Sequence, residues 1–238
     1  MGVTREVSGG VATITMDEAA TANALSHAMV EELGAAFADL GRDRGVRAIV
    51  LAGLPDVFSS GASREVIDDL VSGRRDGGEL LLPRVMLECP LPCVAAMAGY
   101  AIGGGFALGM AADLIVLGAE SRYCLNFLDL GFTPGMGTTR LLEHALSPAI
   151  AHELLFSGEA RRGRDLARTG INHVVPRAEV LARAHDLAAR IADKPRDAVI
   201  ALKRTLSIPR RQAFEVARTH ETLMHAVSFA HLNTRERP

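Results

Sequence analysis

The sequence contains no tryptophan, and aromatic residues make up only 4% of its 238 positions. It therefore lacks the stacking platform that binders of single-stranded nucleic acid use. It also lacks an excess of one charge, because the formal net charge is −2 and both signs are spread along the chain. Without a basic patch, neither nucleic acid nor an anionic membrane surface is an expected partner.

Cysteine is scarce, with only Cys89, Cys93 and Cys124 in the chain. Prolines separate the first two, and no histidine follows at ligand spacing, so no metal site is expected. The absence of a disulfide pattern indicates reduced thiols in an intracellular protein. No N-terminal signal segment and no run long enough to span a bilayer is found. The expected location is the cytoplasm.

What the sequence does contain is a high share of hydrophobic residues, 48%, enough for a substantial core. Short apolar runs alternate with amphipathic segments, which is typical of an α/β protein. A β-hairpin is predicted around Gly9-Gly10, and Ser26 is a plausible N-cap for a helix from His27 to about Leu40. Further strands are predicted at 46–51, 93–97, 114–116, 123–128 and 171–175, with 53–58 as a loop, and further helices from about 64 and over 79–88, 106–112, 138–145, 147–156, 164–168, 178–192, 196–206 and 211–231.

Two glycine-containing segments precede predicted helices. Gly103 to Gly105 stand ahead of an apolar helical run, and Gly61 comes shortly before Ser63, a second plausible N-cap. Glycines at such places allow sharp turns and leave backbone N–H groups exposed at a helix start. Such amides can hold an anion or a developing oxyanion. The alternative is a tight turn with a well-packed helix and no chemical role.

Four motifs in this order resemble the crotonase (enoyl-CoA hydratase/isomerase) superfamily. They are Asn23-Ala24-Leu25, Phe58 to Ala62, Gly99 to Gly105 followed by Asp113, and Pro134 to Gly137, and the resemblance covers nearly the whole chain. It implies a spiral of ββα units over 1–195, which holds the active site, and a helical C-terminal region over 196–238 that assembles trimers or dimers of trimers.

The same resemblance implies that two backbone amides, of Ala62 and Gly104, stabilise a thioester enolate. The substrate would be carried on coenzyme A or on the phosphopantetheine of an acyl carrier protein, with no further cofactor. Lys203 lies on a helix that contacts the nucleotide end of coenzyme A in family members. The alternative is that Lys203 lies on a solvated helix face and contacts no ligand.

Two glutamates of typical hydratases in this family are missing. Their positions are occupied by Ala107 and Phe127. Hydration needs a base to activate water and an acid to protonate carbon, and neither alanine nor phenylalanine supplies one. Decarboxylation generates the enolate directly, so it tolerates an apolar pocket. Phe106 and Phe132 would line that pocket, together with Phe127.

A closer resemblance is to the polyketide β-branching branch of the family, and within it to the decarboxylating type. It is carried by Tyr123, Asn126-Phe127, the loop Gly131 to Gly137 and Met224-His225. It implies a 3-methylglutaconyl thioester as substrate and His225 as a catalytic residue. A tyrosine and a lysine of that type fall here on two apolar pocket positions, Val66 and Leu70.

Alternatives remain open at this point. The chain could be a hydratase or isomerase with relocated acid–base groups, or a catalytically silent scaffold of the same fold. His225 could form only an ion pair with Glu221 at i,i+4 spacing. Tyr123 is a second candidate proton donor, or else a strand residue with a satisfied hydroxyl.

Overall fold

A six-stranded sheet forms the centre of the molecule. The computed structural model describes residues 2–75 and 82–235. The strand order is β1-β2-β4-β7-β9-β12; β1 and β2 are antiparallel, and the remaining pairs are parallel. Parallel strands need cover on both faces, which explains why β4 and β7 are buried along their whole length. The bounds are β1 Val3–Ser8, β2 Val11–Met16, β4 Ala48–Ala52, β7 Cys93–Met97, β9 Leu114–Gly118 and β12 His173–Val175.

The first hairpin and the first helix follow the predicted local signals. Gly9 and Gly10 both have positive φ, 57° and 81°, which suits a two-residue hairpin turn. The Ser26 hydroxyl accepts a hydrogen bond from the amide of Met29, so Ser26 caps α1, His27–Arg42. Both predictions are confirmed.

Two smaller sheets stand beside the central one and supply the loops of the site. One has the order β11-β10-β8-β5, and the other pairs β3 with β6. The prediction of a loop over 53–58 is wrong at its end, because β5 covers Val57–Ser59. The extended segment predicted over 123–128 is also too long, since the chain turns after β10. The other bounds are β3 Ala24–Leu25, β6 Gly61–Ala62, β8 Tyr100–Ile102, β10 Arg122–Cys124 and β11 Arg161–Arg162.

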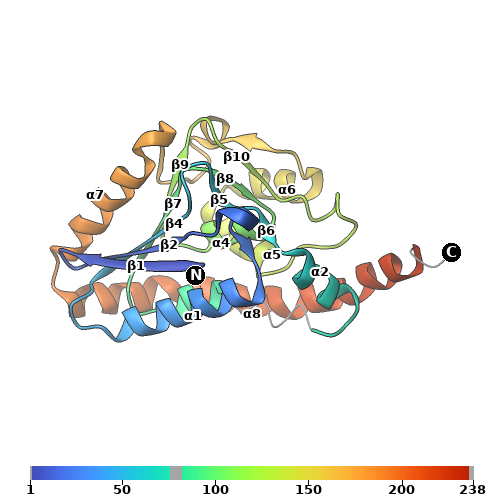
Figure 1. The fold of residues 1–238 in the computed structure, drawn as a ribbon, viewed down its shortest axis with the longest axis horizontal. Coiled ribbons are helices and arrows are strands. Elements are labelled where there is room, and N and C mark those ends of the chain that lie inside the picture. Colours follow the sequence, from blue (N-terminus) through green and yellow to red (C-terminus); the bar gives the residue numbers. More distant parts are fainter. Residues whose placement is uncertain (1, 76–81, 236–238) are drawn as a thin grey trace.

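Helices cover both faces of the central sheet (Figure 1). On one face α7 packs small residues such as Ala184 and Ala188 against valines of β4, β7 and β9. The opposite face packs against α1, whose Leu33 and Phe37 are fully buried. A 3-10 turn replaces the helix predicted at 164–168, and residues 79–81 of another predicted helix lie outside the described residues. The bounds are α2 Arg64–Val71, α3 Leu82–Glu88, α4 Gly104–Met110, α5 Thr138–Ala145, α6 Pro148–Ser157 and α7 Val180–Ala192, with 3-10 turns at 19–21, 163–166 and 177–179.

The C-terminal segment is one long helix, α8, Arg196–Arg235. Two helices were predicted here, over 196–206 and 211–231, and that prediction is wrong, because one helix continues through Pro209. A proline inside a helix costs about 3 kcal/mol, which tertiary packing can outweigh. Here α8 packs on α3 and α5, burying Phe214 against Leu87 and Leu141. Farther along, α8 lies beside α2 (Figure 1). None of the described helices is long and apolar enough to cross a membrane.

Candidate active site

The start of α4 and the short strand β6 bring two backbone segments into contact. A Cβ at Gly61 would lie 2.7 Å from the Ile102 carbonyl oxygen and 3.5 Å from the Gly104 nitrogen. A Cβ at Gly104 would lie 3.8 Å from the Ala62 nitrogen. As the first residue of α4, Gly104 has an amide that no carbonyl of its own helix can reach. The amides of Ala62 and Gly104 therefore lie next to each other.

A buried polar brace fixes the bend that carries Ala62. Asn23 is fully buried with φ of 53°, and its side-chain amide donates to the carbonyls of Met16 and Phe58 at 2.9 and 3.2 Å. The Ser59 hydroxyl donates to the Asn23 carbonyl at 2.8 Å and accepts from the Gly61 amide at 3.2 Å. These bonds satisfy backbone groups that β-ladders leave unpaired where the chain turns between β5 and β6.

A cavity of about 80 Å³ lies beside the two amides. Its walls include six residues selected from the sequence: Ala62, Leu70, Gly104, Phe127, Phe132 and His225. Most of the wall is apolar, and His225 is the one ionisable side chain among the described residues that line it. Sequence reasoning did not select several further lining residues, namely Ile67, Ile102, Asn126, Leu130, Met136 and Phe229.

A second cavity, of about 90 Å³, adjoins the first. The two share Ala62, Leu70 and Met136 in their walls. Val66 lines the second cavity and not the first. His27, Glu31 and Arg75 bring polar groups to the wall of the second cavity, which also includes Leu25, Val30 and Leu82.

Two predicted pocket residues lie elsewhere. Phe106 is fully buried in the core, where its ring stacks on Tyr123 with centroids 5.4 Å apart. Ala107 is also buried and lines neither cavity. Both belong to α4, and the sequence pattern did not show which side of this all-buried helix would face the cavity. The prediction that Phe106 and Ala107 line the pocket is wrong.

Tyr123 is held in the core rather than at the site. Its hydroxyl donates to the Met97 carbonyl at 2.6 Å and accepts from the Gly118 amide at 2.9 Å. Burial raises the pKa of the phenol well above its usual value. Tyr123 lines neither cavity, so the alternative that it donates a proton there is wrong, and the alternative of a strand residue with a satisfied hydroxyl is confirmed.

Three residues of α8 hydrogen-bond the loop at 133–139, namely Glu221, His225 and Ser228. His225 is 5% exposed, and its Nε2 donates to the Thr133 carbonyl at 2.9 Å. Glu221, 3% exposed, accepts from the amides of Gly137 and Thr139 at 2.7 and 2.9 Å, and from the Thr139 hydroxyl at 2.7 Å. Burial raises the pKa of Glu221, and these donors partly offset the rise.

The suggested ion pair between Glu221 and His225 is therefore wrong. The spacing of these residues did predict one shared helix face, but that face lies against the loop. The imidazole of His225 stacks on Phe229 with ring centroids 4.9 Å apart.

Lys203 is not available to a nucleotide at the surface. Its ammonium is buried and lies 2.6 and 2.7 Å from the two carboxylate oxygens of Asp113. Arg210 of α8 also binds this carboxylate, which accepts from the Cys93 amide as well. The predicted contact with coenzyme A and the alternative of a solvated face are both wrong. Lys203 instead fastens α8 to the start of β9.

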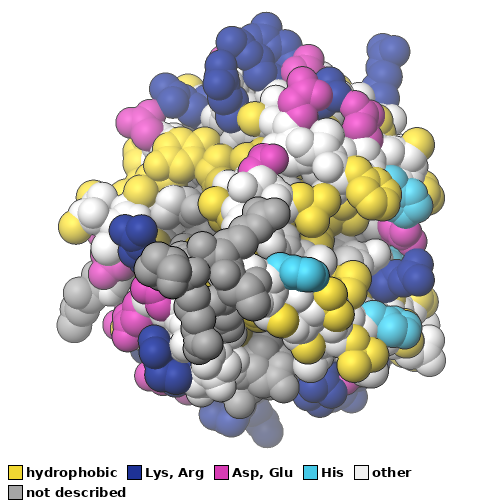
Figure 2. Space-filling view, turned by 90° about the vertical axis from the view of Figure 1, so that its right-hand side faces the viewer, with side chains coloured by type: hydrophobic (Ala, Val, Ile, Leu, Met, Phe, Trp, Pro, Cys, Tyr) yellow, Lys and Arg dark blue, Asp and Glu magenta, His cyan; other side chains and the backbone are white. Residues whose placement is uncertain are grey.

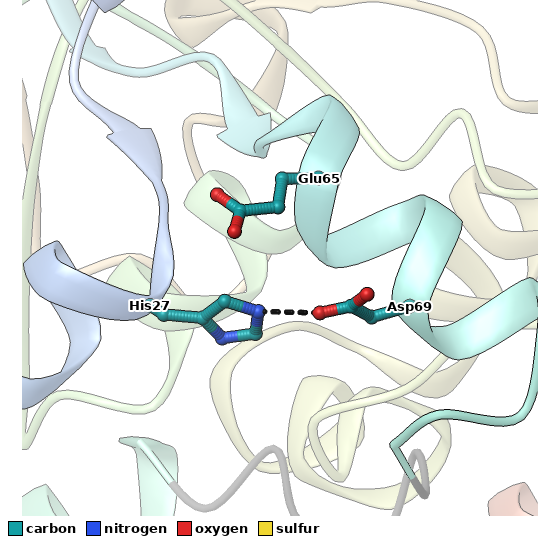
Figure 3. A group of neighbouring side chains, drawn as sticks. All are labelled: His27, Glu65 and Asp69. Carbon is teal, nitrogen blue, oxygen red and sulfur yellow. Dashed lines mark hydrogen bonds and ion pairs between the residues drawn. The ribbon is translucent and has the colours of Figure 1, made fainter.

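His27, Glu65 and Asp69 form a group with side-chain atoms suited to a metal ion, all within 4.8 Å of one another (Figure 3). Asp69 is already engaged: Oδ2 pairs with His27 Nε2 at 2.9 Å, and Oδ1 accepts from Arg74 Nε at 2.7 Å. These two bonds hold the pKa of Asp69 below its usual value, the His27 bond contributing most. Since the Arg74 charge opposes a cation here, the group acts best as a clamp between α1 and α2.

The face of the molecule near α2 and the end of α8 carries both apolar and basic side chains. Hydrophobic side chains are spread over this face, histidines lie in its centre and right half, and lysines and arginines lie mainly toward its top and bottom (Figure 2). An open groove on this side is lined by Ala62 together with Arg64 and Arg74. The carboxylate of Asp68 also belongs to the wall of this groove, so the wall carries charges of both signs.

Comparison with known proteins finds relatives that match nearly the whole chain. The family model described as enoyl-CoA hydratase/isomerase matches residues 6–237. The bacillaene synthase decarboxylase PksI of Bacillus subtilis (strain 168) is 34% identical over 233 residues, which are 98% of this chain and 94% of that protein. The ECH2 decarboxylase domain of CurF from Lyngbya majuscula is 37% identical, with a TM-score of 0.88 over 96% of this chain and 94% of that one. A structure from a dehydratase/decarboxylase enzyme couple involved in polyketide β-branching is 33% identical, with a TM-score of 0.92 and the same coverage.

Proposed function

Because this chain belongs to the enoyl-CoA hydratase/isomerase family and has the crotonase fold, we propose that it is a decarboxylase of an acyl thioester in polyketide β-branching. The observation that carries the proposal is the cavity beside the amides of Ala62 and Gly104. It is apolar, and within the described residues only His225 brings an ionisable group to it.

This composition disfavours hydration. Adding water to a double bond needs a base for the water and an acid for the carbon. The cavity wall offers one histidine, and Phe127 stands where the resemblance places a second hydratase glutamate. Loss of carbon dioxide needs no base at carbon, so one proton donor is enough.

The proposed substrate is a 3-methylglutaconyl thioester. Its carbonyl oxygen accepts hydrogen bonds from the two amides. The bond between the carboxylate and the adjacent methylene carbon breaks, carbon dioxide leaves, and the electron pair moves through the conjugated double bond to the thioester oxygen. The amides stabilise the resulting dienolate. In oxyanion holes, loss of one such donor typically raises the activation free energy by about 2.7–4 kcal/mol.

His225 then protonates carbon and the carbonyl reforms. The proton comes from the imidazolium of His225, whose ring is positioned by the hydrogen bond from Nε2–H to the Thr133 carbonyl. The ring also stacks on Phe229, which restricts its rotation. Apolar walls from Phe127 and Phe132 exclude water from the dienolate, which keeps the interaction with the amides strong.

The thioester would be carried on the phosphopantetheine of an acyl carrier protein or on coenzyme A. Lys203 would not contact the nucleotide of coenzyme A, because its ammonium is paired with Asp113. We also propose a trimer or a dimer of trimers. Exposed apolar side chains along α8 fit a subunit interface: Leu202, Leu206, Ile208, Val216, Leu223 and Val227. Sedimentation equilibrium measures the subunit number, and a monomer at micromolar concentration would refute this part.

One experiment tests the function. The protein is incubated with 3-methylglutaconyl carrier protein and, in parallel, with crotonyl-CoA, and the acyl mass is followed. We expect loss of carbon dioxide from the first and no reaction of the second. Addition of water to crotonyl-CoA would show a hydratase, and no change in either substrate would show a silent scaffold.

The histidine is tested in the same assay. His225→Gln should lower kcat for decarboxylation about 10²–10⁴-fold, the usual range for a lost general acid. His220→Gln is the matched control, because His220 is exposed on the same helix. Equal rates of the two variants would reject proton donation by His225.

A further inference from the structure

Arg75 stands where the cavities of the site meet the surface. It lines the second cavity together with Ala62 and Leu70. It also lines an adjoining open groove of about 440 Å³, whose wall includes Leu70 and His225. Among the described residues that line these two spaces, Arg75 is the one lysine or arginine.

The turn that carries Arg75 is anchored. Its amide donates to the Asp69 carbonyl at 3.2 Å, and the Gly73 amide donates to the Leu70 carbonyl at 3.2 Å. Gly73 has φ of 72°, which lets the chain reverse after α2. The Asp69 side chain is in turn held by His27, as Figure 3 shows, and by Arg74. The backbone of Arg75 is therefore fixed relative to α1 and α2.

The guanidinium of Arg75 is uncommitted within the described part of the chain. The arginines on either side of it, Arg74 and Arg84, pair with Asp69 and Glu88. No described carboxylate forms an ion pair with Arg75, whose side chain is exposed. Exposure suits a group that must release its partner, because solvent screens the pairing.

We propose that Arg75 binds the carboxylate of the acyl chain and selects substrates that carry one. The inference rests on the proposed decarboxylation. A thioester oxygen held by the amides of Ala62 and Gly104 directs the acyl chain into the cavities, past Leu70, to the rim where Arg75 stands. The carboxylate loses its charge as carbon dioxide forms, so a screened contact at the rim gives selectivity without strongly opposing the reaction.

The test uses binding of unreactive ligands. Glutaryl-pantetheine is saturated, so no conjugated double bond can receive the electron pair. Its methyl ester has nearly the same shape and no charge. We expect Arg75→Gln to weaken glutaryl-pantetheine binding about tenfold, as for loss of one hydrogen bond to a charged group, and to leave ester binding unchanged. Arg75→Lys should retain part of the preference, because it keeps the charge.

Arg64→Gln is the matched control, since Arg64 is on α2 but lines neither the two cavities nor the groove beside His225. Its ratio of acid to ester affinity should equal that of the wild type. An unchanged ratio in Arg75→Gln, or an equal loss for acid and ester, would overturn the inference. A wild type that prefers the acid through Arg75, yet releases no carbon dioxide from the 3-methylglutaconyl thioester, would keep this inference and reject the proposed function.

Discussion

Replacing Gly104 by alanine places a methyl group in the space that the thioester oxygen is proposed to occupy. The added Cβ would lie 3.8 Å from the Ala62 nitrogen, 3.1 Å from Met136 Sδ and 3.6 Å from Leu25 Cδ1. The backbone of Gly104 is helical, so alanine adopts it without strain. The closest neighbour is the flexible end of a methionine, which can move by a few tenths of an ångström.

The substitution Gly104→Ala should therefore change kcat strongly and the stability of the fold only slightly. Alanine gains about 0.5–1 kcal/mol over glycine in a helix, which offsets the displacement of Met136. The melting temperature should stay within a few degrees of the wild type, at about 2–4 °C per kcal/mol for a chain of this size. The oxyanion, however, is pushed off its donors, which should lower kcat about 10²–10³-fold.

The assay is release of carbon dioxide under saturating substrate, with melting followed by circular dichroism. Gly34→Ala is the control: it lies within α1, and a Cβ there has no neighbour within 4 Å. This control should keep full activity and gain slight stability. A kcat for Gly104→Ala within about threefold of the wild type, with the fold intact, would refute a transition-state role for this amide.

Three further substitutions test buried polar groups. Lys203→Met leaves the Asp113 carboxylate without one partner, so the free energy of unfolding should fall by about 3–5 kcal/mol in thermal unfolding. KM should stay unchanged, because Asp113 binds Lys203 away from the cavities. An altered KM with normal stability would contradict this. Tyr123→Phe should cost about 1–3 kcal/mol from the lost bonds of its hydroxyl, with kcat unchanged, and a large fall in kcat would restore Tyr123 as a proton donor. Burial raises the pKa of Glu221 above its usual 4.5, so the stability it contributes is complete below that pH and is lost as pH rises through the folded-state pKa. Glu221→Gln does not titrate, so the difference in melting temperature between wild type and variant should shrink as pH rises from about 4 to about 7, and a widening difference would contradict the raised pKa.

Local signals in the sequence were sufficient for several elements. The Ser26 cap, the Gly9-Gly10 turn and the buried run of β7 depend on residues adjacent in the chain, and the structure confirms all three. The break predicted between 206 and 211 is wrong, because α8 continues through Pro209. Packing of α8 on α3 and α5 depends on distant residues, so the sequence near Pro209 does not reveal that the helix continues.

The candidate site also combines residues that could be predicted from the sequence with residues that could not. The glycines that allow close approach of two backbones could be selected from spacing and from the family resemblance, and the structure places Ala62 and Gly104 together. The partners of the side chains on α8 could not be predicted in this way. Lys203 and Glu221 are charged residues on an amphipathic helix, for which exposure is the ordinary expectation. Both are buried because their acceptors and donors come from residues more than eighty positions away.

The grip of α8 on the loop at 133–139 also sets an order of events during synthesis. The ribosome completes the sheet, both amides and the loop before it makes the helix that carries Glu221 and His225. Until that helix docks, nothing from α8 holds the Thr133 carbonyl or the amides of Gly137 and Thr139. In the proposed reaction, the nascent chain therefore has the two amides before it has the histidine. A product terminated before α8 would carry Ala62 and Gly104 but lack His225, the proposed proton donor.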